Sequence, residues 1–234
     1  MESEENVQRD ELGALRTQII ERARGVFAHM DEVAEFNTQK VLDAMRECRV
    51  SDAHFGVSAG YAYSDLGREK LDELYARVFG AERALVRTQF VSGTHALATV
   101  LFGILRPNDQ LVSITGAPYD TMQTVIGWAH ENSGSLKEFG VDYDELPMQD
   151  GRVDMDGIER IVTAQTKVAL VQRSRGYSER EPLSIDDIRA VSARIKAANP
   201  NCIVFVDNCY GEFVDTIEPT ELPTVDIMAG SLIK

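Results

Sequence analysis

The sequence is poor in cysteine, in basic residues and in long apolar runs, and each shortage excludes a class of protein. The three cysteines, Cys48, Cys202 and Cys209, lack the spacing of a disulfide framework or a zinc site. With 24 basic against 38 acidic residues, the formal net charge of −14 opposes binding to nucleic acid or to an anionic membrane surface. No apolar run approaches the roughly 20 residues of a membrane span, and the acidic N-terminus does not resemble a secretory signal. We therefore expect a soluble protein of the reducing cytoplasm.

A glycine-rich dinucleotide fingerprint is also absent, because no G-x-G-x-x-G follows a predicted strand. The acidic residues are scattered along predicted helices, as on a solvated surface, whereas hard metal ions require clustered oxygen ligands. The sequence thus argues against a plain dinucleotide-binding domain and predicts no metal site.

The periodicity divides the chain into an N-terminal helical segment, residues 1–55, and a larger domain, residues 56–234. Apolar residues recur at helical spacing from Asp10 to about Val50, so this segment needs a partner surface. The Gly- and Tyr-rich stretch 54–68 is expected to be a loop, and residues 69–80 a helix closed by Gly80.

Short strands and helices alternate after residue 80. We expect strands over 83–89, 110–114, 135–140, 167–172 and 202–207, and helices over 94–105, 121–132, 155–163 and within 184–200. The last helix has Ser184 as its cap and Pro200 just beyond its end. Apolar strands separated by helices predict a mostly parallel, doubly wound α/β sheet. The alternation has no natural stop at residue 234, so we expect a further C-terminal portion outside this sequence.

Chemistry-bearing residues follow four of the predicted strands, at the edge of the sheet where ligands of α/β folds bind. They lie in "SGTHA" (92–96), in "TGAPYDTM" with Tyr119, in "DNCYGEF" with Asp207, and in "GSLIK" with Ser231 and Lys234. Each has an ordinary explanation when taken alone: a helix cap at 92–96, a half-buried Tyr119, a turn-capping Asp207 and a solvated Lys234. Together and in this order, they suggest one site.

At these residues the chain resembles the fold type I pyridoxal-phosphate enzymes, in particular the cystathionine and methionine γ-lyase group. It is most similar to the branch called methionine γ-lyase-like or aluminium-resistance proteins. The resemblance runs from about Gly60 to Lys234, and the best-matching pieces are "VSGTHA", "PYDT", "FVDNCYGEF" and "DIMAGSLIK". It implies the large domain of that fold, with pyridoxal 5′-phosphate as cofactor and a small C-terminal domain absent from this sequence.

The resemblance also assigns roles at the phosphate end of the cofactor. The amides of Gly93 and Thr94, in the turn that begins at Ser92, would bind the phosphate together with the Ser231 hydroxyl. In the family, a tyrosine and an arginine of a neighbouring subunit also reach the phosphate. Here the equivalent stretch reads "GYAYSDLGR", and the candidates are Tyr63 and Arg68, with Tyr61 behind them.

At the ring end, Tyr119 would stack on the pyridine and Asp207 would keep its nitrogen protonated. Lys234 would form the aldimine with the cofactor and afterwards move protons, so that Tyr119 and Lys234 are the catalytic candidates. The family usually places an asparagine on the ring hydroxyl after the strand at 167–172. Here that stretch reads "QRSRGYS", and the possible substitutes are Arg173, Arg175 and Tyr177. The alternative is that the two arginines form a solvated turn or a salt bridge.

The implied activity is a carbon–sulfur lyase that acts on a sulfur amino acid by elimination through an aldimine and a carbanion. Two alternatives remain: a pyridoxal-phosphate enzyme of another reaction type, such as transamination, and a non-enzymatic protein that confers metal resistance. The expected partners are an amino-acid substrate and other copies of the chain, as a homodimer or homotetramer. Tyr63 and Arg68 would then serve the neighbour's site, unless Arg68 pairs with Asp72 four residues later on its own helix.

Overall fold

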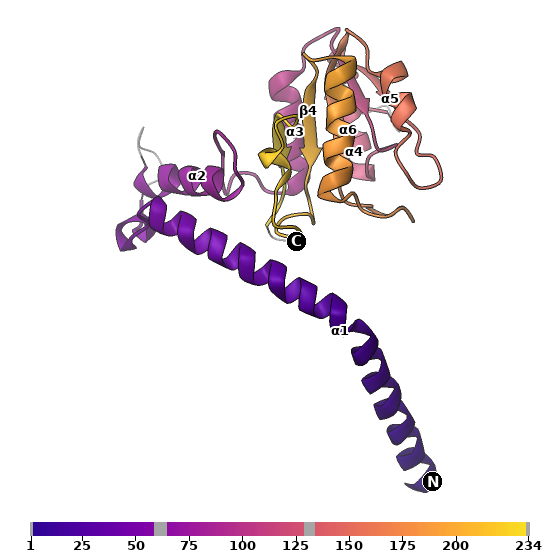
Figure 1. Cartoon of the computed structure of the whole chain (residues 1–234). Coiled ribbons are helices and arrows are strands. Elements are labelled where there is room, and N and C mark those ends of the chain that lie inside the picture. Colours follow the sequence, from indigo (N-terminus) through magenta and orange to yellow (C-terminus); the bar gives the residue numbers. More distant parts are fainter. Residues whose placement is uncertain (1, 59–64, 129–133, 233–234) are drawn as a thin grey trace.

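The computed structural model describes residues 2–58, 65–128 and 134–232. A long helix, α1 (Glu2–Glu47), leads through a short 3-10 helix, η1 (Asp52–Phe55), to helix α2 (Leu66–Val78), which packs on the later turns of α1. The remaining elements form one α/β unit, from which α1 extends as an arm (Figure 1).

A five-stranded sheet of parallel strands forms the centre of that unit, in the order β2-β1-β3-β4-β5. The strands are β1 (Gln110–Ser113), β2 (Asp142–Glu145), β3 (Thr166–Gln172), β4 (Ile203–Asp207) and β5 (Ile227–Ala229). Because all strands run the same way, their carboxyl ends meet at one edge of the sheet.

Helices cover both faces of the sheet. On one face lie α3 (Gly93–Ile104) and α4 (Asp120–Ile126), and on the other lie α5 (Met155–Ile161) and α6 (Ile185–Ala198), followed in the chain by the 3-10 helix η2 (Pro219–Glu221). In β4, Phe205 faces α3 and α4, whereas Val204 and Val206 face α6. Apolar side chains on both faces of the strand are therefore buried, and the predicted doubly wound sheet is confirmed.

Helix α6 begins where its sequence predicts. The Ser184 hydroxyl accepts a hydrogen bond from the Asp187 amide (3.1 Å), and the Asp187 carboxylate accepts one from the Ser184 amide (2.9 Å), which together make a capping box. At the end of α2, Gly80 has a φ of +60°, a conformation that glycine adopts at little cost.

Two strand predictions are wrong. Residues 83–89 form no strand, because the Val86 amide and the Arg87 guanidinium both bind the Asp72 carboxylate of α2 rather than a neighbouring strand. Residues 135–140 form turns, and the strand in this region is β2, whose sequence DYDE is polar because it lies at the edge of the sheet.

Helix α1 is a single continuous helix, with apolar side chains that its own chain leaves uncovered. Leu12, Ile19, Val26 and Met30 are all more than half exposed. The later turns of the helix pack on the rest of the chain, and Asn37 and Ala44 are buried there. No helix among the described residues has the length and apolar character needed to cross a membrane.

The Asn37 side chain ties α1 to the loop after β4. Its amide nitrogen donates hydrogen bonds to the backbone carbonyls of Phe213 (3.1 Å) and Asp215 (3.0 Å). Lys40, one turn later, forms a salt bridge with Glu221 (2.6 Å). The position of this loop therefore depends on α1.

Candidate active site

The carboxyl ends of β3, β4 and β5 bring the predicted ring-binding residue close to the predicted lysine segment. Gln172 pairs with Asp207 across β3 and β4, and Asp207 pairs with Ala229 across β4 and β5. Ser231 follows two residues after Ala229. This edge therefore places Asp207 beside the start of the segment that leads to Lys234.

The N-terminus of α3 forms a second part of the site. The Ser92 hydroxyl caps this helix by accepting a hydrogen bond from the His95 amide (3.1 Å). Gly93, the first residue of the helix, is buried. The first amides of a helix have no partner within it and, with the helix dipole, favour an anion. Ser92 is thus the predicted cap, and the turn that it caps suits a phosphate.

Tyr119 connects the α3 terminus to the edge of the sheet. Its hydroxyl oxygen lies 3.1 Å from Thr94 Oγ1, and its backbone N–H donates a hydrogen bond to Gln172 Oε1 (3.2 Å). Burial is the main cause that raises the pKa of Tyr119 to about 12, and the negative charge of Asp207 raises it further, whereas the bond with Thr94 lowers it. Tyr119 is therefore a neutral phenol at physiological pH, between the two predicted ends of the cofactor.

Asp207 is a buried carboxylate, with 3% of its surface exposed. Its Oδ1 accepts a hydrogen bond from the Cys209 amide (3.0 Å), so the turn after β4 fixes its orientation. Burying a carboxylate is costly unless charged or polar groups compensate. A carboxylate at this edge is suited to binding a cationic group of a ligand.

Ser231 is described, whereas Lys234 lies outside the described residues, as do Tyr61 and Tyr63. The Ser231 amide donates a hydrogen bond to Glu212 Oε1 (2.7 Å), which joins the loop after β5 to the loop after β4. The structure thus brings Thr94 to Tyr119 and places Ser231 next to the strand end that carries Asp207.

Arg68 lies in the first turn of α2, whose later turns pack on Phe213 and on Met228 of β5. Its backbone amide donates a hydrogen bond to the capping Asp65 (3.0 Å). Both carboxylate oxygens of Asp72 accept from Arg87 (2.7 and 2.9 Å). Asp72 therefore has Arg87 as an ion-pair partner, and the pairing of Arg68 with Asp72 stays a prediction.

The three suggested substitutes for the ring-hydroxyl ligand have different positions. Arg173 is 3% exposed and its guanidinium binds Asn208 (2.9 Å), the Gly211 carbonyl (2.7 Å) and the Asp215 carboxylate, so it forms the salt bridge named as the alternative. Arg175 and Tyr177 are exposed. Arg173 therefore supports the loop after β4 and is not available to a ligand.

Sequence reasoning missed two residues of this edge. Gln172 is a polar residue at the end of an otherwise apolar strand, and that position could have identified it, because strand ends carry the ligand contacts of such sheets. Glu212 contacts Ser231 across 19 residues, and no local pattern indicates such a contact.

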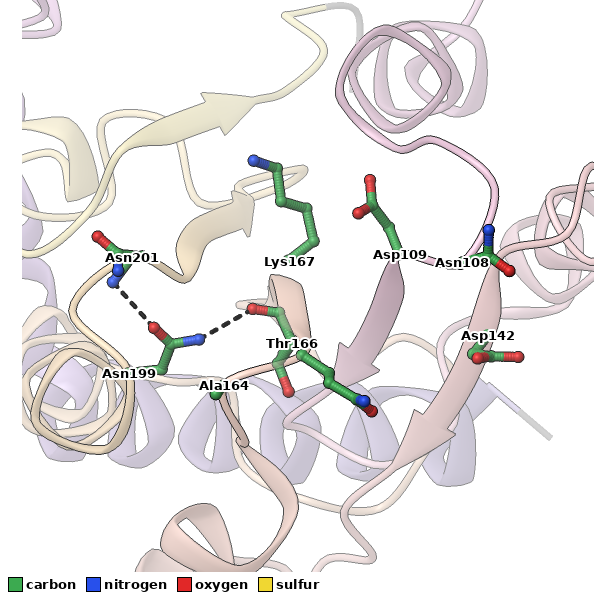
Figure 2. Close-up of a pocket in the computed structure, with 9 residues that line it drawn as sticks. Asn108, Asp109, Asp142, Ala164, Thr166, Lys167, Asn199 and Asn201 are labelled. Atoms are coloured by element: carbon green, nitrogen blue, oxygen red, sulfur yellow. Dashed lines mark hydrogen bonds between the residues drawn. The ribbon is translucent and has the colours of Figure 1, made fainter.

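A separate pocket of about 510 Å³ lies at the opposite, amino edge of the sheet. Asp142 and Thr166, at the starts of β2 and β3, contribute to its lining. Figure 2 shows Asn199 hydrogen-bonded to both Thr166 and Asn201, and the distances are 3.1 and 2.9 Å. Both bonds join the Asn199 side chain to backbone groups, the Thr166 carbonyl and the Asn201 amide, and none of the predicted site residues lines the pocket. Among the described residues, no group of three or more His, Cys, Asp or Glu side chains is placed to hold a metal ion.

The sequence pattern of the methionine γ-lyase family matches residues 13–234, nearly the whole chain. The chain belongs to this family. Over 212 residues it is 47% identical to the protein YnbB of Bacillus subtilis (strain 168), and the match covers 90% of this chain and 50% of YnbB. The family assignment agrees with the resemblance in "SGTHA", "DNCYGEF" and "GSLIK".

Solved structures of similar proteins share the fold. A proposed cystathionine β-lyase involved in aluminium resistance from Listeria monocytogenes is 49% identical, with a TM-score of 0.91, and the match covers 94% of this chain and 56% of that one. A carbon–sulfur lyase involved in aluminium resistance from Clostridium novyi is 43% identical, with a TM-score of 0.90 and coverage of 96% and 54%. The chain therefore spans about half the length of the relatives that it matches.

Proposed function

We propose that this chain forms the cofactor-binding part of a pyridoxal-phosphate-dependent carbon–sulfur lyase, which acts on a sulfur amino acid by elimination. The observation that carries the proposal is the buried Asp207 at the end of β4, next to the strand β5 that leads to Ser231 and Lys234. Membership of the methionine γ-lyase family supports it, as does the name of the Clostridium novyi relative.

The residues present fit the proposed cofactor. The first-turn amides of α3, at Gly93 and Thr94, suit its phosphate, and the Ser231 hydroxyl would add a further donor. The Asp207 carboxylate suits a protonated ring nitrogen, and the half-buried Tyr119 ring would cover the pyridine face. When bound, pyridoxal phosphate supplies an electron sink for bond changes at the α-carbon of an amino acid.

The residues of the chain would then position groups and move protons. Lys234 would hold the cofactor through its amine and, once the substrate has displaced it, would act as the base at the substrate carbons. Tyr119, a neutral phenol hydrogen-bonded to Thr94, would keep the ring in place and would hold its proton at the phenolic oxygen. Asp207, held by the Cys209 amide, would lie opposite the ring nitrogen.

The assignment of Lys234 can be tested by borohydride reduction of the purified protein with pyridoxal phosphate, followed by peptide mapping. We expect a pyridoxyl group on Lys234 and a visible absorbance band that changes when a sulfur amino acid is added. The Lys234→Ala variant, treated in parallel, should carry no label. A label on a different lysine would refute the assignment.

A shared site in a dimer is part of this proposal. The exposed apolar residues of α1 fit a surface that a second copy covers, because large uncovered apolar surfaces are typical of association sites. Helix α2 contacts α1 and carries Arg68. Arg68 suits the proposed role because the paired donors of a guanidinium match phosphate oxygens.

A further inference from the structure

We propose that Glu212 is a positioning residue that fixes the backbone leading to Lys234, an inference that rests on the proposed function. Glu212 Oε1 accepts a hydrogen bond from the Ser231 amide at 2.7 Å. This bond joins the loop after β4 to the loop after β5. The carboxylate therefore holds the backbone three residues before Lys234, at the residue whose hydroxyl is a proposed phosphate ligand.

Gly230 is shaped to admit this contact. A Cβ atom at position 230 would lie 2.2 Å from Glu212 Oε1 and 3.2 Å from Glu212 Cδ. Because non-bonded atoms do not approach so closely, a side chain at position 230 would push the carboxylate off the Ser231 amide. The bond between Glu212 and the Ser231 amide thus requires glycine at position 230, and Gly230→Ala is a second way to disrupt that bond.

The backbone on both sides of Glu212 is held in place. The preceding carbonyl, of Gly211, accepts a hydrogen bond from the buried Arg173 guanidinium (2.7 Å). The following amide, of Phe213, donates one to the buried Glu218 carboxylate (2.8 Å). Glu212 therefore lies in a loop whose backbone is fixed. Its hydrogen bond to the Ser231 amide fixes the position of Ser231 relative to that loop.

The bond continues the pairing of β4 and β5 beyond the end of the sheet. The Asn208 amide donates a hydrogen bond to the Ala229 carbonyl (2.8 Å), two residues before Ser231. A charged acceptor makes a stronger bond than a neutral one. Glu212 would act on the cofactor through Ser231 and Lys234, without contact of its own.

The experiment compares Glu212→Ala, Glu212→Gln and Gly230→Ala with the wild-type protein, and uses Glu179→Gln as a control that removes one exposed carboxylate. Two quantities are measured: hydrogen exchange at the Ser231 amide without cofactor, and the dissociation constant of pyridoxal phosphate. In Glu212→Ala we expect the exchange rate of the Ser231 amide and the dissociation constant of pyridoxal phosphate each to rise by roughly 10- to 100-fold. This is the range for loss of a hydrogen bond to a charged group. Gly230→Ala should behave similarly, Glu212→Gln should be intermediate, and the control should match the wild type.

Two results would overturn the proposal. Unchanged exchange in Glu212→Ala would show that the bond does not hold the Ser231 amide. Faster exchange with unchanged cofactor affinity would show that the bond orders only the loop. Both results leave the proposed function intact, whereas failure of the wild-type protein to bind pyridoxal phosphate would overturn the proposed function and this role together. Thermal unfolding without cofactor should stay a single cooperative transition in every variant, which separates positioning from loss of fold.

Discussion

Thr94 Oγ1 lies 3.1 Å from the hydroxyl oxygen of Tyr119, although 25 positions separate the two residues along the chain. The contact links the first turn of α3 to the N-cap residue of α4. Tyr119 also binds Gln172 at the end of β3 through its backbone amide. Its ring is therefore fixed from two sides before any ligand binds, which is the preorganisation that a stacking residue needs.

The raised pKa of Tyr119 predicts how stability changes at high pH. Its folded-state pKa of about 12 exceeds the usual value of 10, so the folded state binds the phenolic proton more tightly than the unfolded state does. This contribution is complete below pH 10 and is lost as the pH rises to about 12. The free energy of unfolding of Tyr119→Phe should therefore fall less steeply than that of the wild type between these values, as measured by urea denaturation. Parallel curves would contradict the burial of this phenol.

Asp207→Asn should weaken catalysis far more than folding. Asparagine keeps an oxygen that can accept from the Cys209 amide, but it cannot hold a ring nitrogen protonated. We expect turnover to fall by roughly 100-fold or more, the size seen when a preorganised electrostatic contact is removed. Cofactor absorbance should persist, and the free energy of unfolding should change by about 1 kcal/mol or less. Near-normal turnover would show that Asp207 is not the ring partner.

Arg173 and Arg175 provide a matched pair. Arg173→Ala removes a buried guanidinium from the buried Asn208 and from the partly exposed Asp215 carboxylate, and we expect a cost of about 3 kcal/mol, the low end for breaking a buried ion pair. Arg175→Ala, at an exposed position two residues away, should change the free energy of unfolding by about 0.5 kcal/mol or less. Urea denaturation measures both values. Equal effects of the two substitutions would contradict the structural role of Arg173.

Mixing two inactive variants tests the shared site. If each site takes Lys234 from one subunit and Arg68 from the other, half of the dimers in an equal mixture of Arg68→Ala and Lys234→Ala contain one intact site of two. The mixture should then regain about a quarter of the wild-type activity, by the arithmetic of a two-fold dimer. No recovery, with subunit exchange confirmed by mass spectrometry, would mean that each chain builds its site alone.

The elements that the sequence predicted correctly are those whose signals are local. Strands β3 and β4 are nearly continuous apolar runs, and the start of α6 carries its own cap in Ser184 and Asp187. Strand β2 was not predicted because an edge strand buries little, so DYDE has no apolar pattern. Residues 83–89 have the composition of a strand, but the Asp72 side chain takes the Val86 amide, and this contact spans 14 positions.

In the candidate site, too, residues with a local sequence signal could be predicted, whereas residues placed by long-range contacts could not. Asp207 and Ser231 could be predicted because the end of a parallel strand is a recognisable position and the resemblance gave each a role. Arg173 was ambiguous because a guanidinium after a strand can turn outward or inward, and only the packed loop after β4 decides that direction. Glu212 could not be predicted, since its partner Ser231 lies on another loop.

The two hydrogen bonds from Asn37 to the loop after β4 couple the position of α1 to the order of that loop. If a second copy of the chain binds α1 more tightly when the loop is ordered, a ligand that orders the loop must strengthen subunit association by the same factor, because such coupling is reciprocal. Removing the cofactor would then weaken subunit association, and dissociating the subunits by dilution would weaken cofactor binding. The subunit dissociation constant would therefore report on cofactor occupancy without any measurement of catalysis.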